Sequence, residues 1–330
     1  MIPTRTLGPN GPTLSALGFG CMGMSEFYGP SDDIESRRVL EAAVEAGVQL
    51  FDTADTYGLG HNEGLLAPLI AAHGERICVA TKFGIAREPG QYARSINNQP
   101  DYIRRACDAS RQRLGVDTID LYYCHRRDPA VSIEALMETL AALVAEGKVR
   151  AIGLSEVSAD TLRRAAAIHP VAAVQSEYSL WSREPEHGLL DACRELGTTL
   201  VAYSPLGRGF LTGALTSTES LAEDDFRRRS PRFANEALAH NQRLVDALTA
   251  FATARDTTPA QIALAWLINK QPNVIPIPGT RKISRLHENL AGAALTLNTA
   301  EIAELDTLFD PAAVAGERYP AAGWTGIERT

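Results

Sequence analysis

The chain has 330 residues, of which 45% are hydrophobic and 22% are charged, values close to the globular average that exclude a disordered or fibrous protein. Its 32 Lys and Arg residues against 40 Asp and Glu give a formal net charge of −8, which argues against binding to nucleic acid or to anionic lipid. No segment approaches the ~18 consecutive apolar residues of a membrane span, and the N-terminus has no signal-peptide core. We therefore expect a soluble, cytoplasmic protein whose length fits either one barrel-sized domain or two smaller ones; the alternation of strands and helices favours a single domain over residues 1–330.

Short apolar runs alternate with amphipathic helical stretches along the chain. Strands are expected over residues 14–20, 48–54, 77–83, 119–125, 148–155, 171–179, 198–206 and 273–279, and helices over 35–46, 63–72, 102–114, 133–146, 160–168, 185–196 and 259–269. Near-continuous apolar strands separated by helices indicate a parallel sheet that helices cover. Eight such units in roughly 300 residues match an α/β fold, the (β/α)8 or TIM barrel.

Two features of the first 30 residues refine this fold. The doubly wound alternative needs a glycine-rich fingerprint in its first strand–helix turn, and the segment 18–29 lacks that spacing. Two short apolar runs around residues 9–12 predict an N-terminal β-hairpin that could cover the bottom of the barrel.

Two segments lie outside the regular repeat: the polar stretch 212–233 and the tail after Leu308, for which we expect extra helices or irregular chain. In a barrel, extra length after the C-terminal end of a strand lies on the active face. The polar stretch is therefore either a lid over substrate or a solvated loop.

Polar side chains follow three successive expected strands. Asp52, Lys82 and His125 end the second, third and fourth strands, and Tyr57 lies in the loop after Asp52. Each has an ordinary explanation by itself, as a turn residue, a solvated lysine or a core histidine. Because barrel enzymes carry their catalytic groups at the C-terminal ends of strands, the joint placement of the four favours one catalytic site.

The motifs around these residues resemble the aldo-keto reductase family. The segments FDTADTYGLGHNEGLL, VATKFG and YYCHR carry the similarity, which continues through GKVRAIGLSEVS, VQSEYSLWSRE, LVAYSPLGRGFLTG and IPIPGTRKISRLHENL to about residue 309. They look closest to the bacterial and plant branch that is distinct from aldose reductases. The resemblance implies a catalytic tetrad of Asp52, Tyr57, Lys82 and His125, and reversible reduction of an aldehyde or ketone.

The chemistry of these residue types fits carbonyl reduction. Tyr57 can supply the proton, and a nearby Lys82 ammonium is expected to lower its pKa from the ordinary ~10 of a phenol. Asp52 would keep the buried Lys82 charged, and His125 can orient the carbonyl oxygen. Because no side chain donates hydride, a nicotinamide cofactor is required.

The resemblance also implies residues for the nicotinamide half of the cofactor. Ser155 and Gln175 would bind the carboxamide, and Tyr203 would stack on the ring. The loop after Tyr203 would follow the pyrophosphate, with Arg208 on a phosphate; its residues are Ser204, Pro205, Leu206, Arg208 and Gly209. Glu156 stands where many family members have Asn, and a carboxylate can only accept hydrogen bonds.

A basic cluster at the expected start of the last barrel helix indicates NADP(H) rather than NAD(H). Arg281, Lys282 and Arg285 at a helix N-terminus make an anion site suited to the 2′-phosphate. Gly279 and Thr280 are expected beside this cluster on one side. On the other side, the resemblance implies that Glu288 and Asn289 face the adenine.

The substrate is expected to be a small carbonyl compound, which the sequence does not identify further. Met24, Phe27 and Tyr28 are candidate pocket residues because they follow the first strand, and Tyr319 with Trp324 could close over substrate. No metal is expected, and the oligomeric state stays open. Two alternatives are a nucleotide-sensing regulatory protein of the same fold and a lyase that uses Lys82 as a Schiff base, which a paired Asp52 disfavours.

Overall fold

The computed structural model describes residues 2–87 and 94–329, and one parallel eight-stranded sheet forms its centre. The strand order is β12-β11-β10-β9-β8-β5-β4-β3. The strands are β3 (Phe19–Gly20), β4 (Leu50–Asp52), β5 (Cys78–Phe83), β8 (Ile119–Cys124), β9 (Val149–Ser155), β10 (Val171–Glu177), β11 (Thr199–Tyr203) and β12 (Val274–Pro276). Each lies inside a strand predicted from the sequence.

The sheet curls until its two edge strands meet. The backbone N–H of Gly18 donates to the carbonyl oxygen of Pro276 at 3.0 Å, and that of Gly20 donates to Pro278 at 3.3 Å. A Cβ atom on Gly279 would lie 2.5 Å from the carbonyl oxygen of Gly20, so a side chain at this position would hold the two chain segments apart. The contacts close the predicted (β/α)8 barrel.

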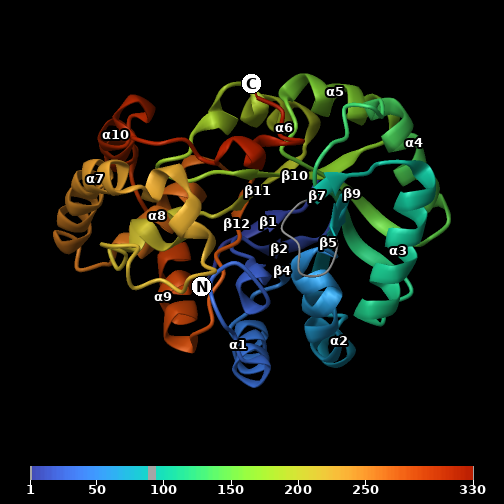
Figure 1. The fold of residues 1–330 in the computed structure, drawn as a ribbon, viewed down its shortest axis with the longest axis horizontal. Coiled ribbons are helices and arrows are strands. Elements are labelled where there is room, and N and C mark those ends of the chain that lie inside the picture. The colour runs from blue at the N-terminus through green and yellow to red at the C-terminus, as the bar shows by residue number, and fades with distance from the viewer. Residues whose placement is uncertain (1, 88–93, 330) are drawn as a thin grey trace.

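Helices surround the strands on the outside of the barrel (Figure 1). They are α1 (Asp33–Glu45), α2 (His61–His73), α3 (Pro100–Leu114), α4 (Ile133–Ala145), α5 (Ala159–Ile168), α6 (Leu189–Leu196), α7 (Asn235–Thr253), α8 (Pro259–Lys270), α9 (Ile283–Ala293) and α10 (Thr299–Leu308). Side-chain caps begin several of them: Asp32, Ser158 and Thr258 each accept from a backbone N–H three residues on. The predicted helix 185–196 is divided at Gly188, whose φ of 98° separates a short 3-10 turn from α6.

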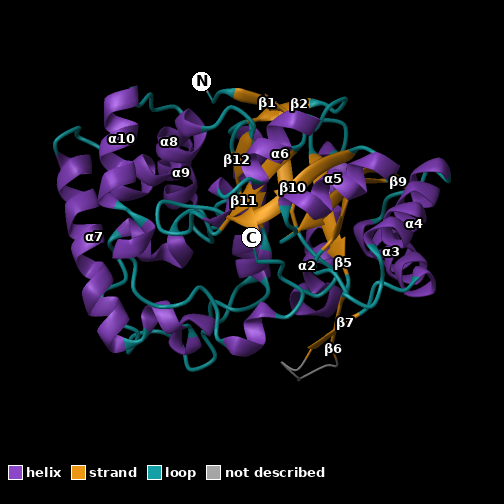
Figure 2. Ribbon diagram, turned by 90° about the horizontal axis from the view of Figure 1, so that it is seen from above, coloured by secondary structure: helices purple, strands orange, loops and turns teal. Residues whose placement is uncertain are grey.

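Two hairpins mark opposite ends of the barrel (Figure 2). The predicted N-terminal hairpin is confirmed: β1 (Thr4–Thr6) and β2 (Thr13–Ser15) pair antiparallel, and Leu7 and Leu14 pack among the residues of the barrel interior. The second hairpin, β6 (Ile85–Arg87) with β7 (Arg94–Ile96), follows the C-terminal end of β5 and was not predicted.

The polar stretch 212–233 ends on the same face as the loop after β3. The backbone N–H of Phe226 donates to the carbonyl oxygen of Phe27 at 3.0 Å, and their rings meet edge to face with centroids 6.2 Å apart. The Phe226 ring also lies 6.3 Å from that of Tyr319 in the C-terminal tail. This end of the stretch is therefore packed against two other segments rather than surrounded by solvent.

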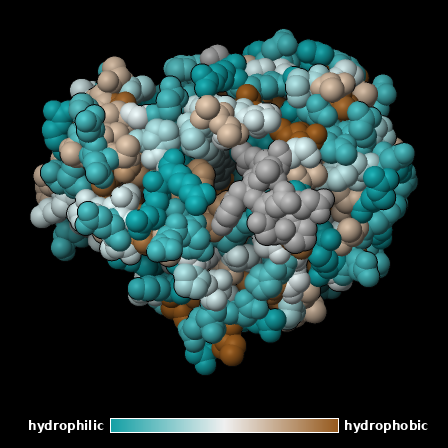
Figure 3. All heavy atoms as spheres, viewed as in Figure 1, coloured by the Kyte–Doolittle hydropathy of each residue, from teal (hydrophilic) through white to brown (hydrophobic). Residues whose placement is uncertain are grey.

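Figure 3 shows the face of the molecule seen in Figure 1. This face is largely hydrophilic, with hydrophobic residues scattered over it and a hollow near its centre. Large hydrophobic side chains that are exposed lie far apart in the chain, at Ile34, Leu59, Ile168 and Ile283. Within residues 2–87 and 94–329 no helix is long and apolar enough to cross a bilayer. The same residues hold no group of three or more side chains suited to bind a metal ion.

Candidate active site

A fully buried Lys82 is the centre of the candidate site. Its Nζ donates to a carboxylate oxygen of Asp52, to the carbonyl oxygen of Thr53 at 2.7 Å and to the hydroxyl of Tyr57 at 3.3 Å. The second carboxylate oxygen of Asp52 accepts from Nε2 of Gln175 at 2.7 Å. Residues from β4, β5 and β10 thus meet at the C-terminal end of the barrel.

Strand register explains why Asp52 and Lys82 meet. Asp52 on β4 pairs with Ala80 on β5, so Lys82 lies two residues further along the same face of β5. The chain then leaves β4 through a tight turn in which Leu59 adopts a φ of 54°. Two side chains hold this turn: Arg87 donates to the carbonyl oxygen of Thr56 at 2.6 Å, and Glu26 accepts from the N–H of Gly58 at 3.1 Å.

His125 follows β8 and faces Tyr57. The two rings meet edge to face, with centroids 5.9 Å apart and planes at 86°. The backbone N–H of His125 donates to the carbonyl oxygen of Phe83 at 2.8 Å, which fixes the start of the loop. The structure therefore brings all four residues of the predicted tetrad to one end of the barrel, and His125 is 8% exposed there.

Charge and burial set the protonation of this group. Burial alone would lower the pKa of Lys82, but Asp52 and Tyr57 outweigh burial and raise that pKa, so the side chain is an ammonium. Burial raises the pKa of Tyr57 above its ordinary value, and the Lys82 charge only opposes part of the rise. The prediction of a lowered Tyr57 pKa is therefore wrong in its net direction, because desolvation of the phenolate exceeds the attraction of the ammonium.

Glu156, whose partner the sequence left open, anchors the C-terminal tail. Its carboxylate accepts from Arg318 at 2.6 Å, from the hydroxyl of Tyr203 at 2.8 Å and from the backbone N–H of Glu177 at 3.0 Å. Burial alone would raise the pKa of Glu156, but Arg318 and then Arg126 outweigh burial and lower it. Neither Arg318 nor Arg126 was predicted as a site residue. Arg318 lies outside the motifs that carry the resemblance, and Arg126 lies inside one of them, YYCHR, but was given no role.

The tail that Arg318 holds covers the ends of β9 to β11. The hydroxyl of Tyr319 lies 2.9 Å from that of Tyr203, and the ring of Trp324 meets the Tyr319 ring at a centroid distance of 5.9 Å. Further along the tail, Glu328 accepts from the backbone N–H of Ser158 at 2.8 Å. These contacts place Tyr319 and Trp324 on the active face.

An ion pair between two side chains with little exposure, Arg208 and Glu177, fixes the loop after β11. Arg208, predicted to contact a phosphate, forms an ion pair with Glu177 at 2.9 Å and donates to the carbonyl oxygen of Arg318 at 3.2 Å. Ser204 and Arg208 adopt φ values of 50° and 58°, so the chain turns sharply through this loop. Its other predicted cofactor residues are Pro205, Leu206 and Gly209, and Pro205 is buried.

The basic cluster lies at the start of α9, as predicted. Arg281 donates to the carbonyl oxygens of Tyr28 at 3.0 Å and Gly29 at 3.3 Å, which ties the cluster to the loop after β3. Arg285 pairs with Glu288 at 2.6 Å, and Lys282 is the residue that precedes the helix. The remaining predicted neighbours lie beside them: the hydroxyl of Thr280 accepts from the Lys282 N–H at 3.1 Å, Gly279 approaches Gly20, and Asn289 is buried.

The predicted pocket residues share the face of the tetrad. Met24 is buried, and Phe27 adopts a φ of 74° where it meets Phe226. The ring of Tyr28 lies under the guanidinium of Arg227, 5.1 Å from the ring centroid. The loop after β3 is therefore in contact with two other segments: Arg281 donates hydrogen bonds to it, and residues 226–227 pack against it.

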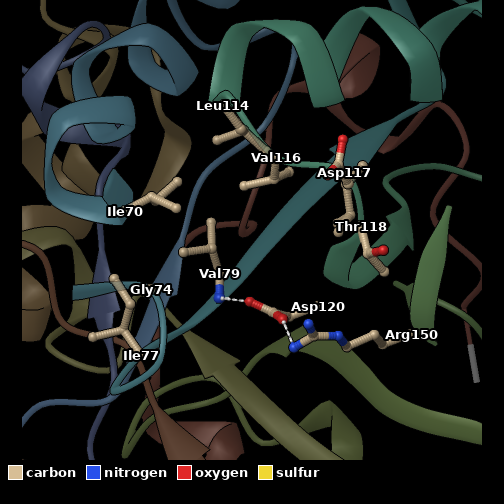
Figure 4. Close-up of a pocket in the computed structure, with 11 residues that line it drawn as sticks. Ile70, Gly74, Ile77, Val79, Leu114, Val116, Asp117, Thr118, Asp120 and Arg150 are labelled. Atoms are coloured by element: carbon tan, nitrogen blue, oxygen red, sulfur yellow. Dashed lines mark hydrogen bonds and ion pairs between the residues drawn. The ribbon is translucent and has the colours of Figure 1, made fainter. Parts of the chain in front are cut away.

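A separate cavity of about 260 Å³ lies at the opposite end of the barrel (Figure 4). Residues that begin β5 and β8 line it, and Asp120 accepts there from the N–H of Val79 at 2.9 Å and from Arg150 at 2.8 Å. Because the tetrad residues lie at the other ends of these strands, this cavity is not part of the candidate active site.

Comparisons with known proteins concern the family and the fold of the chain. Residues 16–310 match the model of the aldo/keto reductase family. The chain is 46% identical over 331 residues to a Schizosaccharomyces pombe protein named aldo-keto reductase yakc, with NADP(+) in its name, and the match spans 99% of this chain and 97% of that protein.

Solved structures give the same fold. A glycerol dehydrogenase, AKR11B4, from Gluconobacter oxydans superposes with a TM-score of 0.84 at 27% identity, covering 93% of this chain and 96% of that one. An aldo/keto reductase from Klebsiella pneumoniae, solved with NADP and acetate, superposes with a TM-score of 0.72 at 26% identity, covering 96% and 98%. This chain belongs to the aldo/keto reductase family.

Proposed function

We propose that this protein is an NADPH-dependent reductase that converts an aldehyde or ketone to an alcohol, reversibly, with Tyr57 as the proton donor. The observation that carries the proposal is the set of contacts around Lys82, which bonds Asp52 on one side and the Tyr57 hydroxyl on the other. A buried phenol beside a buried ammonium is suited to release its proton to a substrate oxygen that gains negative charge.

The residues present fit a bound NADP(H). Three basic side chains, Arg281, Lys282 and Arg285, lie within five residues at the start of α9, where free backbone N–H groups also favour an anion. Ser155 and Gln175 pair with each other on the neighbouring strands β9 and β10 and would hold the carboxamide, and Tyr203 would face the ring. The name of the Schizosaccharomyces pombe relative supports NADP(H) over NAD(H). When bound, the nicotinamide supplies the hydride that no side chain can provide.

The chain's own residues would perform the rest of the reaction. His125 and Tyr57 would hydrogen-bond the carbonyl oxygen and fix its position. Tyr57 keeps its proton at neutral pH, because its pKa lies above the ordinary value, and passes it to the oxygen as the carbon is reduced. Lys82 then stabilises the tyrosinate, and Asp52 keeps Lys82 charged and in place.

Oxidation of NADPH by purified protein tests this proposal. We expect turnover with an activated aromatic aldehyde, faster with NADPH than with NADH, and a loss of at least about a hundredfold in Tyr57→Phe. Tyr122→Phe is the matched control, because its buried hydroxyl makes no hydrogen bond to the residues that the structure describes. Tight NADPH binding without turnover of any carbonyl compound would favour the nucleotide-sensing alternative, and the absence of nucleotide binding would refute the proposal.

A further inference from the structure

Arg126 is a buried arginine next to the tetrad that the proposed mechanism does not use. It follows His125 directly and is 6% exposed. Its Nη1 donates to the carbonyl oxygen of His125 at 2.7 Å and to the hydroxyl of Ser155 at 3.2 Å. Its Nε is buried and makes no hydrogen bond within the described part of the chain. A buried donor of a charged group without a partner is costly, and natural sites seldom leave one without a reason.

The two carboxylates near Arg126, those of Glu156 and Glu177, form ion pairs with other arginines. Glu156 pairs with Arg318 at 2.6 Å, and Glu177 pairs with Arg208 at 2.9 Å. Arg232 lies 3.8 Å from Glu177, so this end of the barrel holds two buried carboxylates and four guanidinium groups with little exposure, those of Arg126, Arg208, Arg232 and Arg318. Among residues 2–87 and 94–329, Arg126 is the member of the four that forms no ion pair.

The position of Arg126 separates it from the anion sites expected for the nucleotide. Those sites are the loop 204–209 and the basic cluster 281–285, whereas Arg126 bonds Ser155, where the uncharged carboxamide is expected. Arg126 directly follows His125, whose ring centroid lies 5.9 Å from that of Tyr57, and its charge opposes part of the rise in the Tyr57 pKa that burial causes. An anion at Arg126 would therefore come from the molecule that Tyr57 protonates.

We propose that Arg126 binds a carboxylate group of the substrate, and that the enzyme acts on aldehydes or ketones that carry such a group. This inference rests on the proposed reductase function. A carboxylate matches both the charge and the fork-like geometry of guanidinium donors, so Arg126 would select acidic substrates and fix the distance between their carboxylate and carbonyl groups.

Matched substrate pairs test the proposal in the intact protein. Succinic semialdehyde with butanal, and 4-carboxybenzaldehyde with 4-methylbenzaldehyde, compare a carboxylate with a neutral group at two spacings. In the wild type, kcat/KM should favour the acid in at least one pair by ten-fold or more. Arg126→Met should lower kcat/KM for that acid by about 10- to 100-fold, the worth of a charge-assisted hydrogen bond, and change it for the neutral partner by less than about threefold.

Controls separate substrate binding from folding and from nucleotide binding. Arg150→Met removes an exposed arginine at the other end of the barrel and should leave the acid preference unchanged. The Kd for NADPH should be the same in the wild type and in Arg126→Met. Arg126→Lys keeps the charge, so its preference for the acid should lie between those of the wild type and Arg126→Met. If Arg126→Met is too unstable to assay, Arg126→Lys gives the same test with a smaller effect.

Three results would overturn the proposal. The first is an equal loss of kcat/KM in Arg126→Met for the acid and for its neutral partner. The second is a weakened affinity of Arg126→Met for NADPH with the acid preference retained. The third is a wild type that reduces both members of each pair equally well. The proposed reductase function is judged separately, by whether the wild type reduces the neutral aldehydes at all.

Discussion

The ion pair between Glu156 and Arg318 gives the most quantitative prediction for this fold. Both side chains are 4% exposed and their charged atoms lie 2.6 Å apart. Arg318→Met leaves the Glu156 carboxylate buried without its ion partner, a change that costs about 3–5 kcal/mol in comparable pairs. An unfolding entropy of about 2.1 cal/mol/K per residue gives ~0.7 kcal/mol/K for a chain of this length, so the melting temperature should fall by about 4–7 °C.

Calorimetry of four proteins measures this effect: wild type, Arg318→Met, Glu156→Gln and the double variant. Because the double variant leaves no unpaired charge, its melting temperature should fall by less than the sum of the two single changes. Arg318→Met should also raise KM for the aldehyde, since Tyr319 loses its anchor beside Tyr203.

Arg329→Met is the control for the tail, because that arginine is exposed and lies 4.0 Å from the centroid of a Trp324 ring, a contact worth about 0.5–1 kcal/mol. Its melting temperature should fall by no more than ~1.5 °C. Additive effects of Arg318→Met and Glu156→Gln would refute the view that this pair holds the tail.

Three further predictions concern the titratable groups around the barrel rim. Asp52→Asn removes the carboxylate partner of Lys82, so kcat at pH 7 should fall by about 10²-fold while the Kd for NADPH stays constant; an unchanged kcat would contradict the role of the pair. Burial and then Glu63 raise the pKa of Asp55 to about 8, so the native state holds a proton that the unfolded state loses near pH 4. Stability should therefore fall by up to ~1.4 kcal/mol per pH unit between about pH 4 and 8, and urea unfolding of Asp55→Asn should lack this slope. Because the pKa of Tyr57 lies above its ordinary value, this proton donor stays protonated between pH 6 and 9, and kcat for reduction by the wild type should not decline over that range; a decline there would contradict this.

The barrel and the meeting of Asp52 with Lys82 could be predicted because their signals are local. The strands are short apolar runs, and polar residues such as Asp52 and His125 lie at or directly after the ends of several of them. The C-terminal ends of parallel strands meet at one rim. Asp52 and Lys82 end consecutive strands of the repeat, so their approach needs no knowledge of distant contacts. The N-terminal hairpin carries its own turn signal in the same way.

The parts that were not predicted lack such local signals. Helix α7 begins after Ala234, which has no side-chain oxygen to cap it, so nothing marks its start in the sequence. The partner of Glu156 is 162 residues away, and only the folded tail brings Arg318 to it. The net pKa of Tyr57 depends on how completely the ring is buried, which residue types alone do not reveal.

The central claim is that hydride passes from NADPH to a carbonyl carbon while Tyr57 protonates the oxygen. Mass spectrometry of the alcohol formed from NADPH deuterated on the transferring face of C4 tests it most directly. The account predicts one deuterium on the carbinol carbon in the wild type and no labelled alcohol above background in Tyr57→Phe. Unlabelled alcohol from the wild type, or trapping of substrate on Lys82 by borohydride without need of nucleotide, would contradict it.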